Sequence, residues 1–448
     1  MAKQVWRKGR IVLAGMCGVV ALSSLAIWGC GTSGYDDPAS AVTTTRTESA
    51  LIEPETLKQW MDEGKVNGTG PDKVVIIDAS TPAQYAAGHI PGAVFLDKDN
   101  ELVQTRLEGL AAAPGMVPDG SRIDSYLQRC GIDKNSTVVF TTNAANPVIW
   151  ATRGYFTLRY WGFPKERIKV LNGYNKAWDA THPGTLTTAV PTVTASSFSV
   201  RDNGATRPDL RASLGEMIQT VKAASAGNVI IDTRGSDGQV GVGSKFSYDG
   251  DAKTTPGVFL PSTPADYVVF EGHMKGGKAV GYTSLLDAAN NSKFLPADQL
   301  ISKFAAVGMD AGKTAYLYCR TGVIASSEFF VLDGILGWTA LDYDGSWSQW
   351  GSMGISPVNG GPQNLEANSL WRTDVAALSE VVTYNPDDDA TDLVEKVLLD
   401  PLSVQLFSNT NDLSANQIEK EDAAYMAGGA AGGPAAGAPA AGTGGGGC

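Results

Sequence analysis

Short apolar segments alternate with amphipathic segments between residues 51 and 357, and the same order occurs twice along the chain. The expected strands are residues 74–78, 137–140 and 168–171 in the first pass, and residues 229–232 and 314–318 in the second. The expected helices are residues 53–63, 122–130 and 150–161, and then residues 214–223, 297–307 and 325–336. Buried strands that alternate with helices are typical of a parallel sheet covered on both faces. The pattern therefore predicts an α/β fold built from two copies of one unit.

The two predicted units are residues 51–185 and 209–357, joined by a polar linker at residues 186–208. The second unit carries an insertion at residues 239–270 that is rich in Gly, Ser, Asp and Pro. A long insertion of this composition is more often a functional or mobile loop than part of a core.

The alternation lapses after residue 357. Residues 358–425 are predicted to form an extension, with short helices at 371–381 and 391–399 that wrap the preceding unit. Residues 426–448 are almost entirely Gly, Ala and Pro and then Cys448. Such a composition has too few large apolar side chains to fold, so this segment is predicted to be a disordered tail.

The first residues have the pattern of an export signal, because four cations precede an uncharged, mostly apolar run at residues 11–27. The run leads to Cys30 in a context that resembles a bacterial lipobox. Residues 1–29 are therefore predicted to be a lipoprotein signal peptide, Cys30 the lipidated residue that holds the chain on a membrane, and residues 30–50 a tether. The expected location is the cell envelope, on the periplasmic side of the inner or outer membrane or at the cell surface. An uncleaved N-terminal membrane anchor is the alternative.

The balance of charge argues against nucleic acid as a partner. The chain has 35 Lys and Arg against 47 Asp and Glu, a net charge of −12, and no basic cluster beyond the first ten residues. No Cys and His spacing suggests a metal site, so neither a metal nor a cofactor is expected.

The five cysteines do not form a disulfide framework in a chain of this length. Cys17 lies in the predicted signal and Cys30 at the lipid site, while Cys130 ends an expected helix and is predicted to pack in the core. Cys319 and Cys448 remain as thiols available for chemistry.

Cys319 stands where an apolar strand stops and a helix is expected to begin. In that geometry the backbone N–H groups of the loop and helix N-terminus converge on the sulfur, which favours the thiolate. Arg320 adds a cation suited to an anionic substrate. Phosphatases and redox proteins also use this element, but Cys-dependent phosphatases need an arginine six residues after the cysteine, and here that residue is Ala325.

Three ordered motifs resemble the tandem-domain rhodanese family, which comprises thiosulfate and mercaptopyruvate sulfurtransferases. Residues 88–93 (GHIPGA) and 272–276 (GHMKG) are similar to its GHIxGA motif, and residues 319–325 (CRTGVIA) to its CRxGVxA active loop. Residues 344–350 (DGSWSQW) are similar to its DGSWxEW signature, with Gln349 in place of the acid. The resemblance covers roughly residues 50 to 357.

The resemblance implies that Cys319 accepts sulfane sulfur as a persulfide and passes it to a thiol or cyanide-like acceptor. The implied contacts to a small anionic sulfur or selenium donor are Arg320, Thr321, Gly322, Val323, Ile324 and Arg234. Asp232 and Ser346 are expected to orient the loop. The first unit is expected to be catalytically silent, because Thr141, Thr142 and Asn143 stand where the second unit has Cys319. His89 and His273 are expected to be structural.

The residues around the loop match neither thiosulfate nor mercaptopyruvate enzymes fully, so they do not single out one substrate. By resemblance, thiosulfate enzymes have a lysine at the position of Thr321 and a second arginine at that of Gly238, whereas mercaptopyruvate enzymes have a small residue at that of Arg320. One alternative is chemistry on another chalcogen oxyanion such as selenite. Another is a non-turnover sulfur carrier or a partner in an envelope redox complex. Cys448 is a hypothetical second thiol that accepts sulfur from Cys319 or resolves its persulfide.

Overall fold

The computed structural model describes residues 49–108, 111–235, 273–350 and 416–429. The predictions for the signal and Cys30, for the insertion, for the helices at 371–381 and 391–399, and for Gly238 and Cys448 lie outside these residues. Within the described ranges, no helix has both the length and the apolar character needed to span a membrane.

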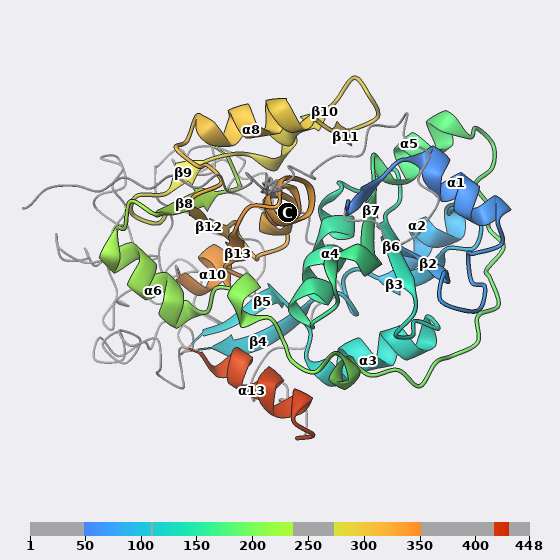
Figure 1. Ribbon diagram of the computed structural model, residues 1–448, viewed down its shortest axis with the longest axis horizontal. Helices are drawn as coiled ribbons and strands as arrows, with labels where there is room; N and C mark the ends of the chain where they lie inside the picture. Colours follow the sequence, from blue (N-terminus) through green and yellow to red (C-terminus); the bar gives the residue numbers. More distant parts are fainter. Residues whose placement is uncertain (1–48, 109–110, 236–272, 351–415, 430–448) are drawn as a thin grey trace, which may run out of the picture. The chain divides into compact units, whose positions relative to one another are not determined.

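The first unit is built on a five-stranded sheet in which all neighbouring strands are parallel. In spatial order the strands are β1 (Leu51–Ile52), β7 (Ile168–Leu171), β6 (Thr137–Thr141), β2 (Val74–Ser80) and β3 (Val94–Asp97). Every residue of β2 is buried, and its alternate side chains enter two different hydrophobic clusters: Val75 and Ile77 one, Val74 and Ile76 the other. The sheet is therefore covered on both faces, and Figure 1 shows helices on both sides of it.

Three helices of the first unit begin and end close to the predicted positions: α1 (Pro54–Asp62), α3 (Gly120–Arg129) and α4 (Ile149–Tyr160). Two more, α2 (Pro82–Ala87) and α5 (Tyr174–Thr181), were not predicted. The helix α3 begins two residues earlier than expected because the carboxylate of Asp119 caps it, accepting the backbone N–H groups of Ser121 and Arg122.

An antiparallel hairpin of β4 (Gln104–Glu108) and β5 (Ala111–Met116) was not predicted. In β4 the buried positions are the polar ones, Gln104, Arg106 and Glu108, while Thr105 and Leu107 are partly exposed. This alternation is the reverse of the usual one for a half-buried strand. The polar side chains are buried because they pair with groups of other elements described below.

The second unit has a four-stranded parallel sheet in the order β13 (Ala340–Asp342), β12 (Thr314–Tyr318), β8 (Asn228–Asp232) and β9 (Lys278–Ala279). Its helices include α6 (Leu214–Ala223), α8 (Ala297–Ala305), α9 (Ala325–Phe329) and α10 (Ser346–Trp350). The helix predicted at 325–336 changes to π-helical geometry over Phe330–Leu336. The predicted α/β class with two parallel-sheet units is confirmed.

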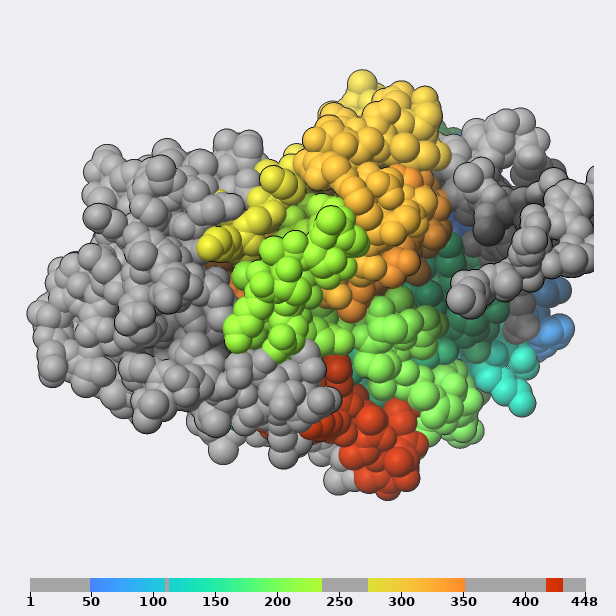
Figure 2. Space-filling model, turned by 60° about the vertical axis from the view of Figure 1, so that its left-hand side comes forward, coloured from blue at the N-terminus to red at the C-terminus, as the bar shows by residue number. Residues whose placement is uncertain are grey.

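One described helix follows the second unit, α13 (Gln417–Met426), and it contacts both units, the second through Glu419 and Arg211. The carboxylate of Asp422 accepts hydrogen bonds from Arg106 at 2.8 and 2.9 Å, and Tyr425 donates to Asp124 at 2.6 Å. Figure 2 shows α13, in red, beside the green segment that connects the two units, where Arg201 donates to the carbonyl oxygen of Tyr425. The contacts of this helix with the first unit were not predicted.

Candidate active site

Cys319 follows the last residue of β12, at the carboxyl edge of the second sheet, and is fully buried. Its Sγ accepts the backbone N–H of Gly322 at 3.1 Å, and Oγ of Ser346 lies 4.0 Å from the same sulfur. The Oγ of Ser346 also donates to the carbonyl oxygen of Tyr343 at 2.9 Å, so the N–H of Gly322 is the closer donor to the sulfur and favours a negative charge on it. One loop amide, that of Gly322, thus donates to the sulfur, and the convergence of further amides stays a prediction.

The N-terminus of α10 holds the backbone of the cysteine loop. The N–H groups of Trp347 and Ser348 donate to the carbonyl oxygens of Cys319 and Arg320 at 3.1 and 2.9 Å. The N–H of Cys319 donates to Oγ of Ser346 at 3.0 Å. The first amides of a helix have no partner within the helix, so the loop satisfies them while they fix the loop. Ser346 therefore lies where a loop-orienting residue was predicted.

Gly322 has a left-handed backbone with φ of +83°. A Cβ atom on this residue would lie 2.4 Å from the carbonyl oxygen of Asp344. Both the conformation and the lack of space require glycine here. The DGSW segment, to which Asp344 belongs, thus packs directly on Gly322, whose N–H donates to the sulfur.

Arg234 and Asp232 form a buried ion pair beside the loop. Nε and Nη2 of Arg234 donate to the two carboxylate oxygens of Asp232 at 2.9 and 2.6 Å. The guanidinium lies over the rings of Trp347 and Tyr318, 5.4 and 5.6 Å from their centroids. The backbone N–H of Thr233 donates to the carbonyl oxygen of Tyr318, the residue before Cys319. Contact between Arg234 and a substrate stays a prediction.

The remaining predicted contacts are all buried: Arg320, Thr321, Val323 and Ile324 are between 2% and 8% exposed. Thr321 faces the β4–β5 hairpin. A Cβ atom on Gly115 would lie 2.5 Å from the carbonyl oxygen of Thr321 and 2.7 Å from its Cβ. The first unit therefore closes over the position at which, by resemblance, thiosulfate enzymes carry a lysine.

A buried charge cluster underlies the loop, and sequence reasoning missed most of it. The carboxylate of Asp344 accepts hydrogen bonds from Arg153 of α4 at 2.7 Å, from Arg211 just before α6 at 3.4 Å and from the N–H of Val117 at 2.8 Å. Arg211 also donates to Glu108 of β4 at 3.2 Å. Both arginines are 0% exposed. An arginine inside a helix whose other residues are all buried, as in α4, is the one sequence signal that could have indicated this cluster.

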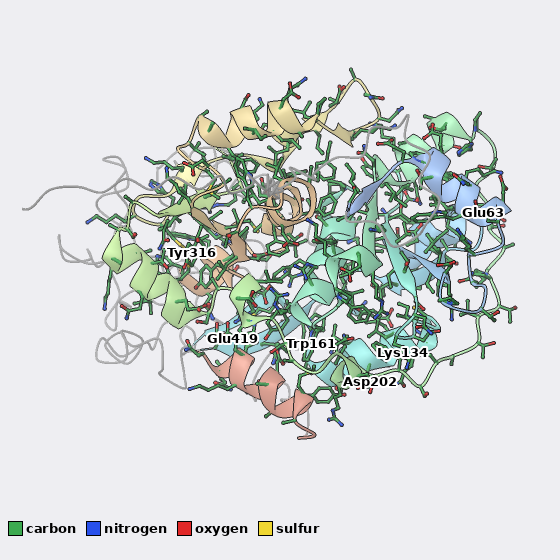
Figure 3. The ribbon with its side chains drawn as sticks, in the orientation of Figure 1. Glu63, Lys134, Trp161, Asp202, Tyr316 and Glu419 are labelled. Carbon is green, nitrogen blue, oxygen red and sulfur yellow. The ribbon has the colours of Figure 1, made fainter. Side chains whose placement is uncertain are left out.

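Two further carboxyl groups complete the cluster. Glu419 of α13 accepts a hydrogen bond from Arg211 at 3.3 Å, and Figure 3 shows Glu419 where α13 meets the hairpin. Burial, with Glu108 and Glu216 nearby, raises the pKa of Glu419 to about 8. Burial also raises the pKa of Asp342 well above its ordinary range. The two guanidinium groups of the cluster contact the carboxylates of Asp344 and Glu108 directly.

In the first unit, side-chain hydrogen bonds fix the loop between β6 and α4, which corresponds to the Cys319 loop. Asn146 and Gln84 exchange two side-chain hydrogen bonds at 2.8 and 3.0 Å, and Asn146 also donates to Oγ1 of Thr142 at 2.9 Å. Thr142 donates to the carbonyl oxygen of Ala79 at 2.7 Å. The side chains of Thr142 and Asn146 therefore form hydrogen bonds to each other and to β2 and α2 of the same unit.

His89 and Cys130 have structural surroundings. The two ring nitrogens of His89 lie 2.9 and 3.1 Å from the carbonyl oxygens of Tyr85 and Ala189, and its ring stacks on that of Tyr85. Cys130 is buried in the core, where burial raises the pKa of its thiol to about 12. His273 is 2% exposed. No group of three or more His, Cys, Asp or Glu residues that could hold a metal occurs within the described part of the chain.

The chain is similar to known proteins in sequence and in fold. Residues 53–181 match the rhodanese-like domain. The sulfur carrier protein TtuD of Thermus thermophilus is 23% identical over 318 residues, which cover 70% of this chain and 97% of that protein. A putative thiosulfate sulfurtransferase of Haloferax volcanii is 26% identical over 320 residues, with the same coverage. An anaerobic ergothioneine biosynthesis enzyme from Chlorobium limicola has a similar fold, with a TM-score of 0.50, 19% identity, and coverage of 67% of this chain and 68% of that one.

Proposed function

We propose that this chain, whose residues 53–181 belong to the rhodanese family, is a sulfurtransferase that carries sulfane sulfur as a persulfide on Cys319. The observation that carries the proposal is the hydrogen bond from the N–H of Gly322 to Sγ of Cys319 at 3.1 Å. A donor aimed at the sulfur supports both the attacking thiolate and the negative outer sulfur of a persulfide.

The chemistry needs no external oxidant or reductant. The thiolate of Cys319 attacks the sulfane sulfur of an anionic donor. A new S–S bond forms, the bond between that sulfur and the rest of the donor breaks, and its electron pair leaves with the departing anion. A thiolate or cyanide-like acceptor then attacks the outer sulfur of the persulfide, and the thiolate of Cys319 is released.

The surroundings of the loop favour a donor that requires few cations. Arg234 is already paired with Asp232, and Thr321 packs against Gly115 where a lysine would otherwise reach the donor. Direct hydrogen bonds to a charged group contribute about 1.5 to 3 kcal/mol each, so their loss weakens binding of a dianion strongly. We expect slow turnover of thiosulfate compared with that of donors of lower charge.

The test is a panel of thiosulfate, mercaptopyruvate, polysulfide and selenite against wild type, Cys319→Ser and Cys130→Ala. We expect at least one donor to be turned over by wild type and by Cys130→Ala, and by Cys319→Ser not at all. Turnover of selenite alone would favour the chalcogen alternative. Equal rates with wild type and Cys319→Ser for every donor would refute the assignment.

A non-turnover sulfur carrier is the second candidate, and the similarity to a protein named a sulfur carrier favours it specifically. The amount of sulfur transferred per protein molecule distinguishes a carrier from an enzyme. Labelling of Cys319 by one equivalent of sulfur, with no further transfer in excess donor and acceptor, indicates a carrier. Many equivalents transferred to the acceptor indicate the enzyme.

Location in the cell envelope through a lipid on Cys30 is part of the proposal and is supported by the sequence pattern of residues 1–30. Growth of the producing cells with labelled palmitate should label wild type and leave Cys30→Ser unlabelled. Equal fractionation of the two proteins away from membranes would contradict this part.

A further inference from the structure

Arg153 lies in α4 of the first unit, yet it reaches the active loop of the second. Its Nη2 donates to Oδ1 of Asp344 at 2.7 Å and to the carbonyl oxygen of Gly115 at 2.6 Å. Its Nη1 lies 3.5 Å from the carbonyl oxygen of Gly322, at the long limit of a hydrogen bond. The side chain is 0% exposed.

Gly322 is held on three sides. Its N–H donates to Sγ of Cys319, its carbonyl oxygen faces Arg153, and the space where a side chain would stand is filled by the backbone of Asp344. The direction of the N–H therefore depends on two groups that Arg153 contacts directly. A rotation of this glycine would take the N–H away from the sulfur, because hydrogen bonds weaken steeply with angle.

We propose that Arg153 is a positioning residue for the sulfur-transfer reaction. It holds Gly322 in the orientation in which its N–H donates a hydrogen bond to Sγ of Cys319. The inference rests on the proposed function, and it assigns a task to the first unit, which has no nucleophile of its own. Arg153 contacts neither Sγ nor the position of a donor, so it acts through Gly322 and Asp344.

The geometry requires an arginine. The planar guanidinium places donors toward three acceptors, on Gly115, Gly322 and Asp344, that belong to three different segments. An ammonium group is compact and reaches fewer of these positions at once. Burial of the cation is compensated by the carboxylate of Asp344, which is itself shared with Arg211.

Arg159 provides a matched control on the same helix. It also forms a buried ion pair with the second unit, donating to Asp333 at 3.0 and 3.1 Å, but neither residue has a hydrogen bond to the cysteine loop. Arg153→Gln and Arg159→Gln each remove one inter-unit arginine pair from α4. A general loss of packing between the units would affect both variants alike.

The readout is the rate at which iodoacetamide alkylates Cys319 as a function of pH, measured on the full chain below its melting temperature, with Cys130→Ala as the common background. We expect Arg153→Gln to slow alkylation at neutral pH by about tenfold or more, since a hydrogen bond to the charged sulfur is lost. The pH midpoint should rise as well. Arg159→Gln should melt earlier than wild type and alkylate at the wild-type rate, and Arg153→Lys should lie between Arg153→Gln and wild type.

Equal alkylation by wild type and Arg153→Gln, or an equal loss in Arg153→Gln and Arg159→Gln, would overturn the proposal. If Arg153→Gln does not fold, Arg153→Lys carries the comparison. Alkylation needs no sulfur donor, so the result stands even if no donor is turned over. Failure of the positioning role and failure of the sulfurtransferase assignment are thereby separated.

Discussion

Thr142 occupies in the first sheet the place that Cys319 occupies in the second. Asp78 of β2 pairs with Thr141 of β6, and Asp232 of β8 pairs with Tyr318 of β12, so the next residue along each chain is Thr142 or Cys319. The loops then differ. The helix α4 begins seven residues after Thr142, whereas α9 begins six residues after Cys319. The loop of the first unit is therefore one residue longer than that of the second.

A thiol at position 142 should gain no activity. The N–H groups of Asn143, Ala145 and Asn146 already donate to Ser80 and to the side chain and carbonyl oxygen of Asn143. In a Thr142→Cys/Cys319→Ser variant we expect no sulfur transfer and slow alkylation across the neutral range. The comparison is with the same alkylation assay on wild-type Cys319. Turnover by the double variant would show that the strand-end position alone is sufficient.

Gly322→Ala should cost both stability and activity. The alanine would be strained at φ of +83° and its Cβ would stand 2.4 Å from the carbonyl oxygen of Asp344. We expect a loss of about 2 to 4 kcal/mol in the free energy of unfolding and a fall of about tenfold or more in sulfur transfer. Gly337→Ala is the control, because Gly337 has φ of +68° with no atom within 4 Å of an added Cβ. It should lose only about 1 kcal/mol and keep its activity. Denaturant unfolding and donor turnover measure both effects.

Glu419 should make the protein less stable as the pH rises. In the unfolded chain it ionises near its ordinary value of 4.5, while burial keeps it protonated in the folded state up to a pKa of about 8. Between these values the folded protein binds a proton that the unfolded chain has released. Stability from this group is therefore complete below about pH 4.5 and is lost progressively up to pH 8.

Denaturant unfolding at pH 5 and pH 8 tests this effect. Glu419→Gln keeps the shape of the neutral acid, so its stability should fall less between the two pH values, by on the order of 1 to 3 kcal/mol. Glu421→Gln on the same helix, whose side chain is 29% exposed, should follow the wild type. The same pH dependence in Glu419→Gln and wild type would disprove the assignment to Glu419.

Gln349 stands where the DGSWxEW signature has an acid, and Glu108 places a carboxylate next to it. Nε2 of Gln349 donates to the carbonyl oxygen and to Oε2 of Glu108 at 3.2 and 3.4 Å, and Glu108 in turn accepts from Arg211. Gln349→Glu would place a second buried carboxyl group beside Glu108. We expect it to lower the free energy of unfolding by about 2 to 4 kcal/mol. Gln349→Glu/Glu108→Gln should recover much of that loss, and strictly additive effects in a double-mutant cycle would contradict the exchange.

The strands β2, β6, β7, β8 and β12 could be predicted from the sequence because each is a continuous apolar segment covered on both faces. The strand β4 could not, because its buried positions are polar and are stabilised by partners such as Asp119, Arg211 and Asp422 that lie far away or follow later in the chain. The position of α13 could not be predicted for the same reason, because its partners are distant in the sequence. Its burial depends on Asp422 and Tyr425, whose partners belong to the first unit.

For the site, the order of strand, cysteine and helix could be read from local residues. The hydrogen bonds of Ser346 and Gly322 also involve residues in motifs that were recognised. The contributions of Arg211 and Gly115 were not predicted, since they arise only where segments distant in the sequence meet the loop. A cation inside an apolar helix indicates that a partner exists, and local sequence does not say which carboxylate it is.

The docking of α13 also affects how the protein is made. Asp422 is 316 residues later in the chain than Arg106, the buried cation it neutralises. At a translation rate of about 5 to 20 residues per second, about 15 to 60 s pass between the synthesis of Arg106 and that of Asp422. During that interval Arg106, Asp124 and Tyr160 lack their carboxylate or phenol partners from α13. A chain interrupted before residue 416 would leave Arg106, Tyr160 and Asp124 without these partners.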